Sequence, residues 1–430
     1  MRVSRALRLT NESTTTTTTT TQIASRLDAH LVLPLLEFAL ARGTHASDEI
    51  NAEKLRVLMK TNLCDLAKEL PGADAKALDA QRTAVIAEHG ALKAKASKGI
   101  AFAANGAAMK AMRRDKAHNA KVAEEEYETG ASDVEALYAF GKLEYECGDY
   151  ASAAEHLGAV QFLSVDAGRS ESALWGKFAA DILMRNWSGA LDDMNRLRDA
   201  IENNAATSAL KKMRQRTWLL HYALFVFFNH PNGRNLIIDL MFQERYMQAV
   251  QQEAPYLMRY LAVAVLINKK RRNTLKDLVR LIQSDSYRDP ALEFILALFV
   301  EYDFSKTREA LATCDEMLDK DFFLVGCKEA FDEAARQHVV ENYCKVNKTI
   351  DIKALAEQFT ISPDSIESWI ANLIRTNRLN AKIDAAEGVV RVNAQVKSVN
   401  EQIIEKTKAL LSKTKSLTQA VMAHNQTQAV

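Results

Sequence analysis

Histidines and cysteines come nearest to the spacing of a metal or catalytic site in this sequence. His221 and His230 flank the expected end of one helix, and His338 precedes Cys344 by six residues. Neither pair has carboxylates at ligand spacing, so a buried or surface histidine with a backbone partner is the favoured interpretation. The acidic triplet at 124–126 fits a solvated helix face better than a cation site. We therefore expect no metal, no cofactor and no catalytic residues.

Signature motifs of the common enzyme classes are also absent. The sequence contains neither glycine-rich phosphate loop, G-x-x-x-x-G-K or G-x-G-x-x-G, and neither H-E-x-x-H nor G-x-S-x-G. A helical hydrolase with histidine-based chemistry stays as the enzyme hypothesis. An Ala substitution at His221 or His230 that abolished function but left assembly intact would support it. The favoured prediction is a protein that is not an enzyme and has no small-molecule substrate.

One dense basic run could contact nucleic acid. It consists of Lys269, Lys270, Arg271 and Arg272. Three interpretations stay open, namely a nuclear import signal, an RNA-phosphate contact and a solvated loop between two helices, of which the loop is favoured. The net charge is only +1, so an RNA contact would have to come from such a local, peripheral patch.

Composition indicates a large helical protein. The 430 residues suggest two or three domains, and only 6 Pro and 15 Gly are present, which favours helix nearly throughout. The five cysteines form no C-x-x-C pair and read as reduced thiols of the cytosol or nucleus. We expect no signal peptide and no membrane span, because the longest apolar run, 218–228, is short and contains His221.

The N-terminal region predicts a disordered extension followed by helices. The threonine run at 14–21 cannot bury apolar surface, so residues 1–21 are expected to be disordered. Folded structure should begin near Gln22, and Pro34 should end or kink the first helix. Further helices are expected at 49–70 and 76–96. Residues 97–130 hold few large apolar side chains and predict a poorly packed helix or mobile linker.

A degenerate repeat follows. The segment starting at Ala136 aligns with the segment starting at Ala173 at an offset of 37 residues. Each copy predicts two helices around a short turn, with an aromatic residue after the turn and a small residue three positions later. This resembles a tetratricopeptide repeat and favours stacked helix pairs, an α-solenoid. Strongly apolar helices follow from Thr217 and should be buried between neighbours.

The last part predicts a winged helix and then a long helix. A short extended segment and a helix precede an amphipathic helix that starts near Pro363, and two strands flank the turn at 387–388. Candidate partner-binding residues here are Ile366, Trp369, Arg375, Arg378, Lys382 and Arg391. A seven-residue apolar repeat then predicts a helix that packs in a bundle with other helices. Its candidate seam residues are Val396, Val399, Ile403, Leu410, Leu417 and Val421.

A solenoid, a winged helix and a C-terminal helix form the layout of PCI-domain subunits. Several strings further resemble the e subunit of eukaryotic translation initiation factor three, in the same order over about 22–410. They are HLVLPLLEF at 30–38, YECGDYASAAEHL at 145–157, LWGKFAADILMRNW at 174–187, RTWLLHYALFVFFNHPNGRNLIIDL at 216–240, DFFLVGC at 321–327 and ESWIANLIRTNRLNAKID at 367–384. The threonine-rich extension, residues 90–130 and the tail after about 410 depart from the family pattern.

The resemblance implies a non-catalytic scaffold subunit in a core of PCI and MPN proteins on the small ribosomal subunit. Implied partners are the c, d and l subunits, with cytoplasmic localisation and a candidate nuclear pool. A PCI subunit of the proteasome lid or signalosome is the alternative. The predicted class is all-α: a helical-repeat (TPR/HEAT-like) solenoid, a PCI winged helix with a small β-hairpin, and a long C-terminal helix. The expected domains are extension 1–21, solenoid 22–215, helical PCI part 216–348, winged helix 349–393, assembly helix 394–424 and tail 425–430.

Overall fold

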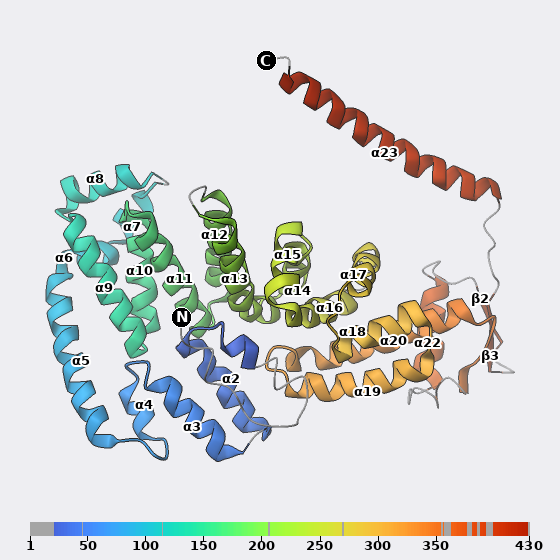
Figure 1. The fold of residues 1–430 in the computed structure, drawn as a ribbon, viewed down its shortest axis with the longest axis horizontal. Helices are drawn as coiled ribbons and strands as arrows, with labels where there is room; N and C mark the ends of the chain where they lie inside the picture. Colours follow the sequence, from blue (N-terminus) through green and yellow to red (C-terminus); the bar gives the residue numbers. More distant parts are fainter. Residues whose placement is uncertain are drawn as a thin grey trace. The chain divides into compact units, whose positions relative to one another are not determined.

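The computed structural model describes residues 21–44, 46–113, 115–204, 207–268, 271–353, 356, 363–375, 381–384, 388–392 and 399–428. The chain divides after Ala335 into two compact units. Helices build the first unit, and the second combines helices with a small sheet (Figure 1). The predicted all-α class with a solenoid and a small sheet is confirmed. Of the predicted disordered extension 1–21, residues 1–20 lie outside the described residues, and residue 21 is helical.

The first unit opens with α2 (Ala29–Arg42), α3 (Ser47–Leu58), α4 (Cys64–Lys68) and α5 (Ala75–Lys95). Asp28 caps α2 by accepting a hydrogen bond from the His30 backbone N–H. The expected end of a helix at Pro34 is wrong, since Pro34 lies inside α2. A proline there removes a single backbone hydrogen bond, and burial of Leu31 and Leu35 on either side of it opposes that loss.

Residues 97–130 fold into three packed helices, so the expectation of a poorly packed helix or linker is wrong. They are α6 (Ser97–Ala104), α7 (Gly106–Ala111) and α8 (Lys116–Tyr127). They contribute Phe102 and buried alanines such as Ala108 and Ala123 to a core that is completed by larger residues of the helices that follow, among them Leu137 and Leu157. The buried Asn119 amide donates to the carbonyls of Arg113 and Phe162, which ties α8 to the repeat region. Buried alanines cover apolar surface, but they do not produce the periodic spacing of large apolar residues from which packed helices are predicted.

The repeat is confirmed as two antiparallel helix pairs. The pairs are α9 (Ala131–Cys147) with α10 (Tyr150–Leu163), and α11 (Ala167–Leu183) with α12 (Trp187–Asn203), which stack in order (Figure 1). The small residues Ala153 and Ala190 are both 0% exposed, as close helix approach requires. In the turn after the first helix of each pair, the equivalent residue has positive φ, +91° at Gly148 and +59° at Arg185. The two turns therefore share one backbone geometry despite different residues.

The strongly apolar region continues the helical stack. It contains α13 (Ala209–Asn229), α14 (Gly233–Met241), α15 (Glu244–Glu253), the 3₁₀ turn η1 (Pro255–Leu257), α16 (Met258–Ile267), α17 (Arg272–Ser284), α18 (Pro290–Leu296), the π-helical turn η2 (Ala297–Glu301), α19 (Phe304–Lys320) and the 3₁₀ turn η3 (Val325–Cys327). All nine residues from Met258 to Leu266 in α16 are buried. The expected burial of this region between neighbouring helices is therefore confirmed for α16.

A buried ionic cluster fastens α16 to the start of α18 and the end of α19. The Arg259 side chain is 0% exposed, and its Nε donates to Asp289 Oδ2 at 2.8 Å. Its second partner is Asp321, at 3.4 Å from Nη1, and the Tyr260 hydroxyl donates to the same carboxylate at 2.8 Å. Asp289 also caps α18 at the Ala291 N–H. Burial raises the pKa of Asp321, and the Arg259 guanidinium opposes this shift.

The second unit holds most of α20 (Lys328–Val346), followed by β1 (Thr349–Asp351), α22 (Pro363–Arg375), β2 (Ala381–Asp384), β3 (Val389–Val392) and α23 (Val399–Gln428). The strands form an antiparallel sheet in the order β1-β3-β2. The predicted hairpin is thus present as β2 and β3, and the short extended segment at 349–351 adds a third strand. The helix predicted to end at His424 continues to Gln428.

Candidate partner-binding surfaces

The predicted winged-helix residues do not all lie on the surface. Ile366 is 0% exposed, as is Ile370 one turn later, so Ile366 stabilises the interior of the unit and cannot contact a partner directly. This corrects its predicted role, because an amphipathic pattern does not reveal whether a domain covers its own apolar face. Trp369 is half-buried and Arg375 is exposed at the end of α22, while Arg378 lies outside the described residues.

Strand register brings two of the predicted basic residues together. Lys382 on β2 is directly opposite Arg391 on β3, and both side chains are exposed. Side chains directly opposite in an antiparallel pair project from the same face of the sheet. The wing therefore places two basic side chains next to each other on one face of the sheet. The sequence predicted both residues but not their pairing, which depends on the register.

Helix α23 exposes the predicted apolar seam. Ile403, Leu410 and Leu417 are 55%, 64% and 66% exposed. Two residues that the seven-residue repeat did not include, Ile404 and Leu411, are 52% and 68% exposed beside them. The exposed apolar face therefore includes residues beyond the predicted seam. The side chains of Val399 and Val421 and the whole of Val396 lie outside the described part of the chain.

Of the basic run 269–272, the structure describes only the last two residues. Lys269 and Lys270 fall outside the described residues, as does the side chain of Arg272, which begins α17. Arg271 forms an ion pair with Asp239 of α14, with 3.1 Å between Nη2 and Oδ2. This hydrogen bond and the charge of Asp239 raise the pKa of Arg271. Arg271 is thus paired with α14, and the interpretation of the basic run as a solvated loop stays a prediction.

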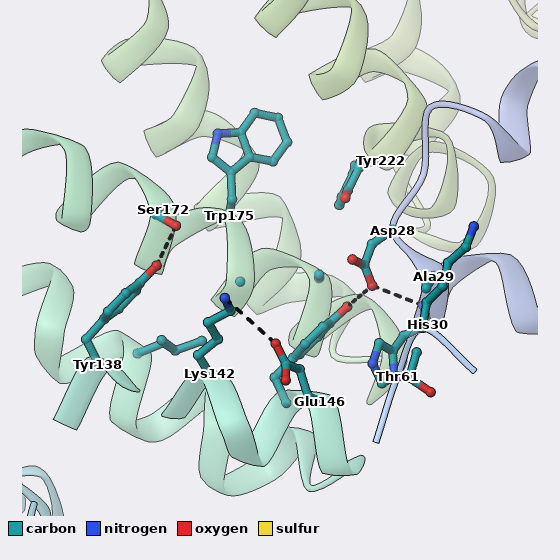
Figure 2. Close-up of a pocket in the computed structure, with 15 residues that line it drawn as sticks. Asp28, Ala29, His30, Thr61, Tyr138, Lys142, Glu146, Ser172, Trp175 and Tyr222 are labelled. Carbon is teal, nitrogen blue, oxygen red and sulfur yellow. Dashed lines mark hydrogen bonds and ion pairs between the residues drawn. The ribbon is translucent and has the colours of Figure 1, made fainter. Parts of the chain in front are cut away.

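A pocket that the sequence did not reveal opens beside the repeats. Its volume is about 300 Å³, and residues from α2, α9, α11 and α13 line it (Figure 2). Trp175 lies on one side, Tyr138 and Lys142 lie on the opposite side, and Asp28 and Tyr222 lie toward one end (Figure 2). The repeat alignment does contain one signal, since Tyr138 and Trp175 occupy equivalent positions at the offset of 37 residues. Nothing in the sequence indicates that residue 28 joins them.

Comparison with known proteins gives the family. The family model described as "eIF3 subunit 6 N terminal domain" matches residues 19–144, and the PCI domain model matches residues 311–394. The E subunit of eukaryotic translation initiation factor 3 from Arabidopsis thaliana is 39% identical over 426 residues, which is 95% of this chain and 97% of that protein. The chain belongs to the family of this initiation-factor subunit.

Relatives of the same name from other eukaryotes agree with this placement. The protein of Bombyx mori is 41% identical over 87% of this chain and 88% of its own length. That of Aspergillus fumigatus is 38% identical over 87% of this chain and 86% of its own length. The resemblance carried by the sequence strings is therefore confirmed, and the proteasome-lid or signalosome alternative is not favoured. The N-terminal family match includes residues 90–130, which had looked divergent from the family pattern.

In this member of the initiation-factor family, His221 is a buried, hydrogen-bonded side chain. Its side chain is 0% exposed; Nδ1 donates to the Thr217 carbonyl at 2.6 Å, and Nε2 accepts from the Tyr256 hydroxyl at 2.7 Å. This confirms the favoured interpretation of a buried histidine with a backbone partner. No group of three or more His, Cys, Asp or Glu that could hold a metal ion occurs in the described ranges. No helix in those ranges is long and apolar enough to cross a membrane.

Stability at acid pH should depend on His221. Burial lowers the pKa of His221 to about 4, whereas an unfolded histidine titrates near about 6.5, so the unfolded chain binds the proton first. Stability should therefore fall as the pH drops from about 6.5 to about 4, by about 3 kcal/mol in all. In urea unfolding at about pH 7 and about pH 5, His221→Gln should lose less stability between the two pH values than the parent. His118→Gln should behave as the parent does, and an equal loss in the parent and His221→Gln would contradict the prediction.

Proposed function

We propose that this chain is a non-catalytic scaffold subunit of translation initiation factor three, which helps assemble the PCI and MPN core on the small ribosomal subunit. The observation that carries the proposal is the match to the E subunit of this factor over nearly the full length of both proteins. A scaffold needs surfaces that recruit neighbours, and the exposed apolar face of α23 is such a surface.

Two sets of residues would make the contacts. The seam residues Ile403, Leu410 and Leu417 of α23, together with the predicted seam residues Val396, Val399 and Val421, would pack in a shared helical bundle. On the winged helix, Trp369, Arg375, Arg378, Lys382 and Arg391 would meet the neighbouring PCI subunit. The run at 269–272 is a weaker candidate for a peripheral RNA contact, because Arg271 already pairs with Asp239.

The resemblance supplies the expected neighbours and compartment. They are the c, d and l subunits and the small ribosomal subunit, in the cytoplasm, with a candidate nuclear pool. We assign the solenoid to 22–215, the helical PCI part to 216–348, the winged helix to 349–393 and the assembly helix to 394–424. The match of the PCI domain model to 311–394 supports the later part of this division.

Affinity purification of the tagged full chain from its own cells, followed by gradient sedimentation, tests the function. Other subunits of initiation factor three should co-purify, and the complex should migrate with the small ribosomal subunit. Recovery of proteasome-lid or signalosome subunits in their place would keep the PCI fold and overturn the assigned complex. A chain that sediments alone at physiological salt would overturn the scaffold role.

A further inference from the structure

The pocket beside the repeats lies outside every surface assigned above. Its lining comes from segments far apart in the sequence, including Asp28 before α2, Lys142 and Glu146 on α9, Trp175 on α11 and Tyr222 on α13. A volume of about 300 Å³ is at the lower end of the range for ligand sites, roughly 300–1,000 Å³. The pocket can therefore hold one or two side chains but not a large cofactor.

Aromatic rings form much of the wall. Trp175 and Tyr222 meet with their ring centroids 5.3 Å apart and their planes at 76°, so they form a corner. Both rings are half-buried, and part of each is accessible. The Tyr138 hydroxyl is hydrogen-bonded to Ser172 Oγ at 2.7 Å, which fixes a third ring on the opposite side. Aromatic faces carry partial negative charge and attract cations at distances up to about 6 Å.

A carboxylate lies at the end of the pocket near Tyr222 (Figure 2). Asp28 Oδ1 accepts from the His30 backbone N–H at 3.0 Å and from the Tyr145 hydroxyl at 2.9 Å. No ion pair joins Asp28 to a basic side chain in the described part of the chain. Burial and then the charge of Asp28 raise the pKa of Tyr145, and the same two causes raise the pKa of Tyr150. A cation in the pocket would form an ion pair with the Asp28 carboxylate.

Two lysines also line the pocket and raise the opposite possibility of an anionic ligand. Lys142 lies 3.8 Å from Glu146 on the same helix, so its charge is largely compensated. Lys60 is exposed beyond the end of α3. An anion inside the pocket would face Asp28, which has no ion-pair partner among the described residues, and the rings of Trp175, Tyr222 and Tyr138. Electrostatics inside the pocket therefore favours a cation.

We propose that this pocket binds the cationic side chain of an arginine in an extended segment of a partner protein. A planar guanidinium can stack on the Trp175 ring and still donate two N–H groups to a carboxylate such as Asp28, which a lysine ammonium cannot do in the same way. The acidic groups disfavour the phosphates of RNA. The inference goes beyond the proposed function, and peptide binding by the purified chain can fail while assembly succeeds, or the reverse.

Fluorescence anisotropy of the purified full chain with short Gly/Ser peptides tests the ligand class. The peptides carry one central Arg, citrulline or Glu, and citrulline differs from Arg chiefly by lacking the charge. The Arg peptide should bind about 10-fold more tightly than the citrulline peptide, as expected for one charge-assisted hydrogen-bonded pair. Equal binding of Arg and citrulline peptides, or preference for the Glu peptide, would overturn the proposal.

Three substitutions tie the binding to the pocket. Asp28→Asn keeps the helix cap, since Asn also caps helices, and should weaken binding of the Arg peptide about 10-fold. Trp175→Ala should weaken it by a similar factor. Lys142→Met removes a repulsive cation and leaves Glu146 without its ion-pair partner, so this variant should bind the Arg peptide about 2–5-fold more tightly. Weaker binding by this variant would indicate an anionic ligand and overturn the proposal.

Matched controls keep the test specific. Trp218 is 46% exposed on α13 and does not line the pocket, so Trp218→Ala should leave binding unchanged. An equal loss in Trp218→Ala and Trp175→Ala would overturn the assignment to the pocket. The assignment would also be overturned if Trp175→Ala weakened binding of oligouridine as much as it weakened binding of the Arg peptide. Asp28→Asn and Lys142→Met decide the outcome if Trp175→Ala fails to fold.

Discussion

Replacing Arg259 by Met should lower the free energy of unfolding of the full chain by about 3–5 kcal/mol. The loss follows from the two carboxylates that the substitution would leave behind, because Asp289 and Asp321 are 0% and 2% exposed and share this one guanidinium. Removing one partner of a buried ion pair leaves an uncompensated charge in a medium that solvates it poorly. Urea unfolding followed by circular dichroism would measure the change.

Controls for this prediction come from the same chain. Arg280 pairs with Asp277 on the surface, with 77% of the Arg280 side chain exposed, so Arg280→Met should change stability by less than about 0.5 kcal/mol. Adding Asp289→Asn and Asp321→Asn to Arg259→Met should recover part of the loss, since Asn keeps the capping oxygen without the charge. A loss below about 1 kcal/mol in Arg259→Met would show that water or local rearrangement compensates the buried carboxylates.

Acidic substitutions on the α23 seam should remove the chain from its complex without unfolding it. Leu410 and Leu417 are 64% and 66% exposed, so Leu410→Asp with Leu417→Asp costs little in the isolated chain. In a bundle the same two carboxylates would be buried without partners. We expect the yield of co-purifying subunits to fall about 10-fold or more, because central apolar residues commonly dominate an interface.

The opposite side of α23 provides the matched control. Ser412 and Ser416 are turned away from Leu410 and Leu417 by the helical repeat of about 3.6 residues, and both are exposed. Ser412→Asp with Ser416→Asp adds the same charge to the same helix and should leave co-purification unchanged. Full recovery of subunits with the Leu410→Asp/Leu417→Asp chain would contradict the assembly role of the seam.

Predictions from the sequence were correct where a residue pattern is compatible with only one local structure. The 37-residue offset located both helix pairs, and the turn at 387–388 located β2 and β3. The predictions failed at 97–130, where the segment itself contributes Phe102 and small residues such as Ala108 and Ala123 to a core completed by larger side chains of α9 and α10. Such residues give almost no periodic signal, although they allow helices to approach closely.

The candidate sites were harder to predict for a different reason. A face of α22 or α23 reads as apolar in either case, but only the fold decides that Ile366 is covered by its own unit while Leu410 is exposed. The pocket depends on the approach of residue 28 to residues 138, 175 and 222, which no local pattern encodes. Likewise, the pairing of Lys382 with Arg391 follows from the strand register alone.

The spacing of the Arg259 cluster along the chain has a consequence during synthesis. Asp321 is made 62 residues after Arg259, so α16 leaves the ribosome before the carboxylate that it requires exists. At roughly 5–20 residues per second this interval lasts about 3–12 s, during which the almost wholly apolar helix α16 lacks one of the two carboxylates of its cluster. The apolar surface of α16 therefore stays incompletely covered in the nascent chain until α19 and Asp321 have emerged.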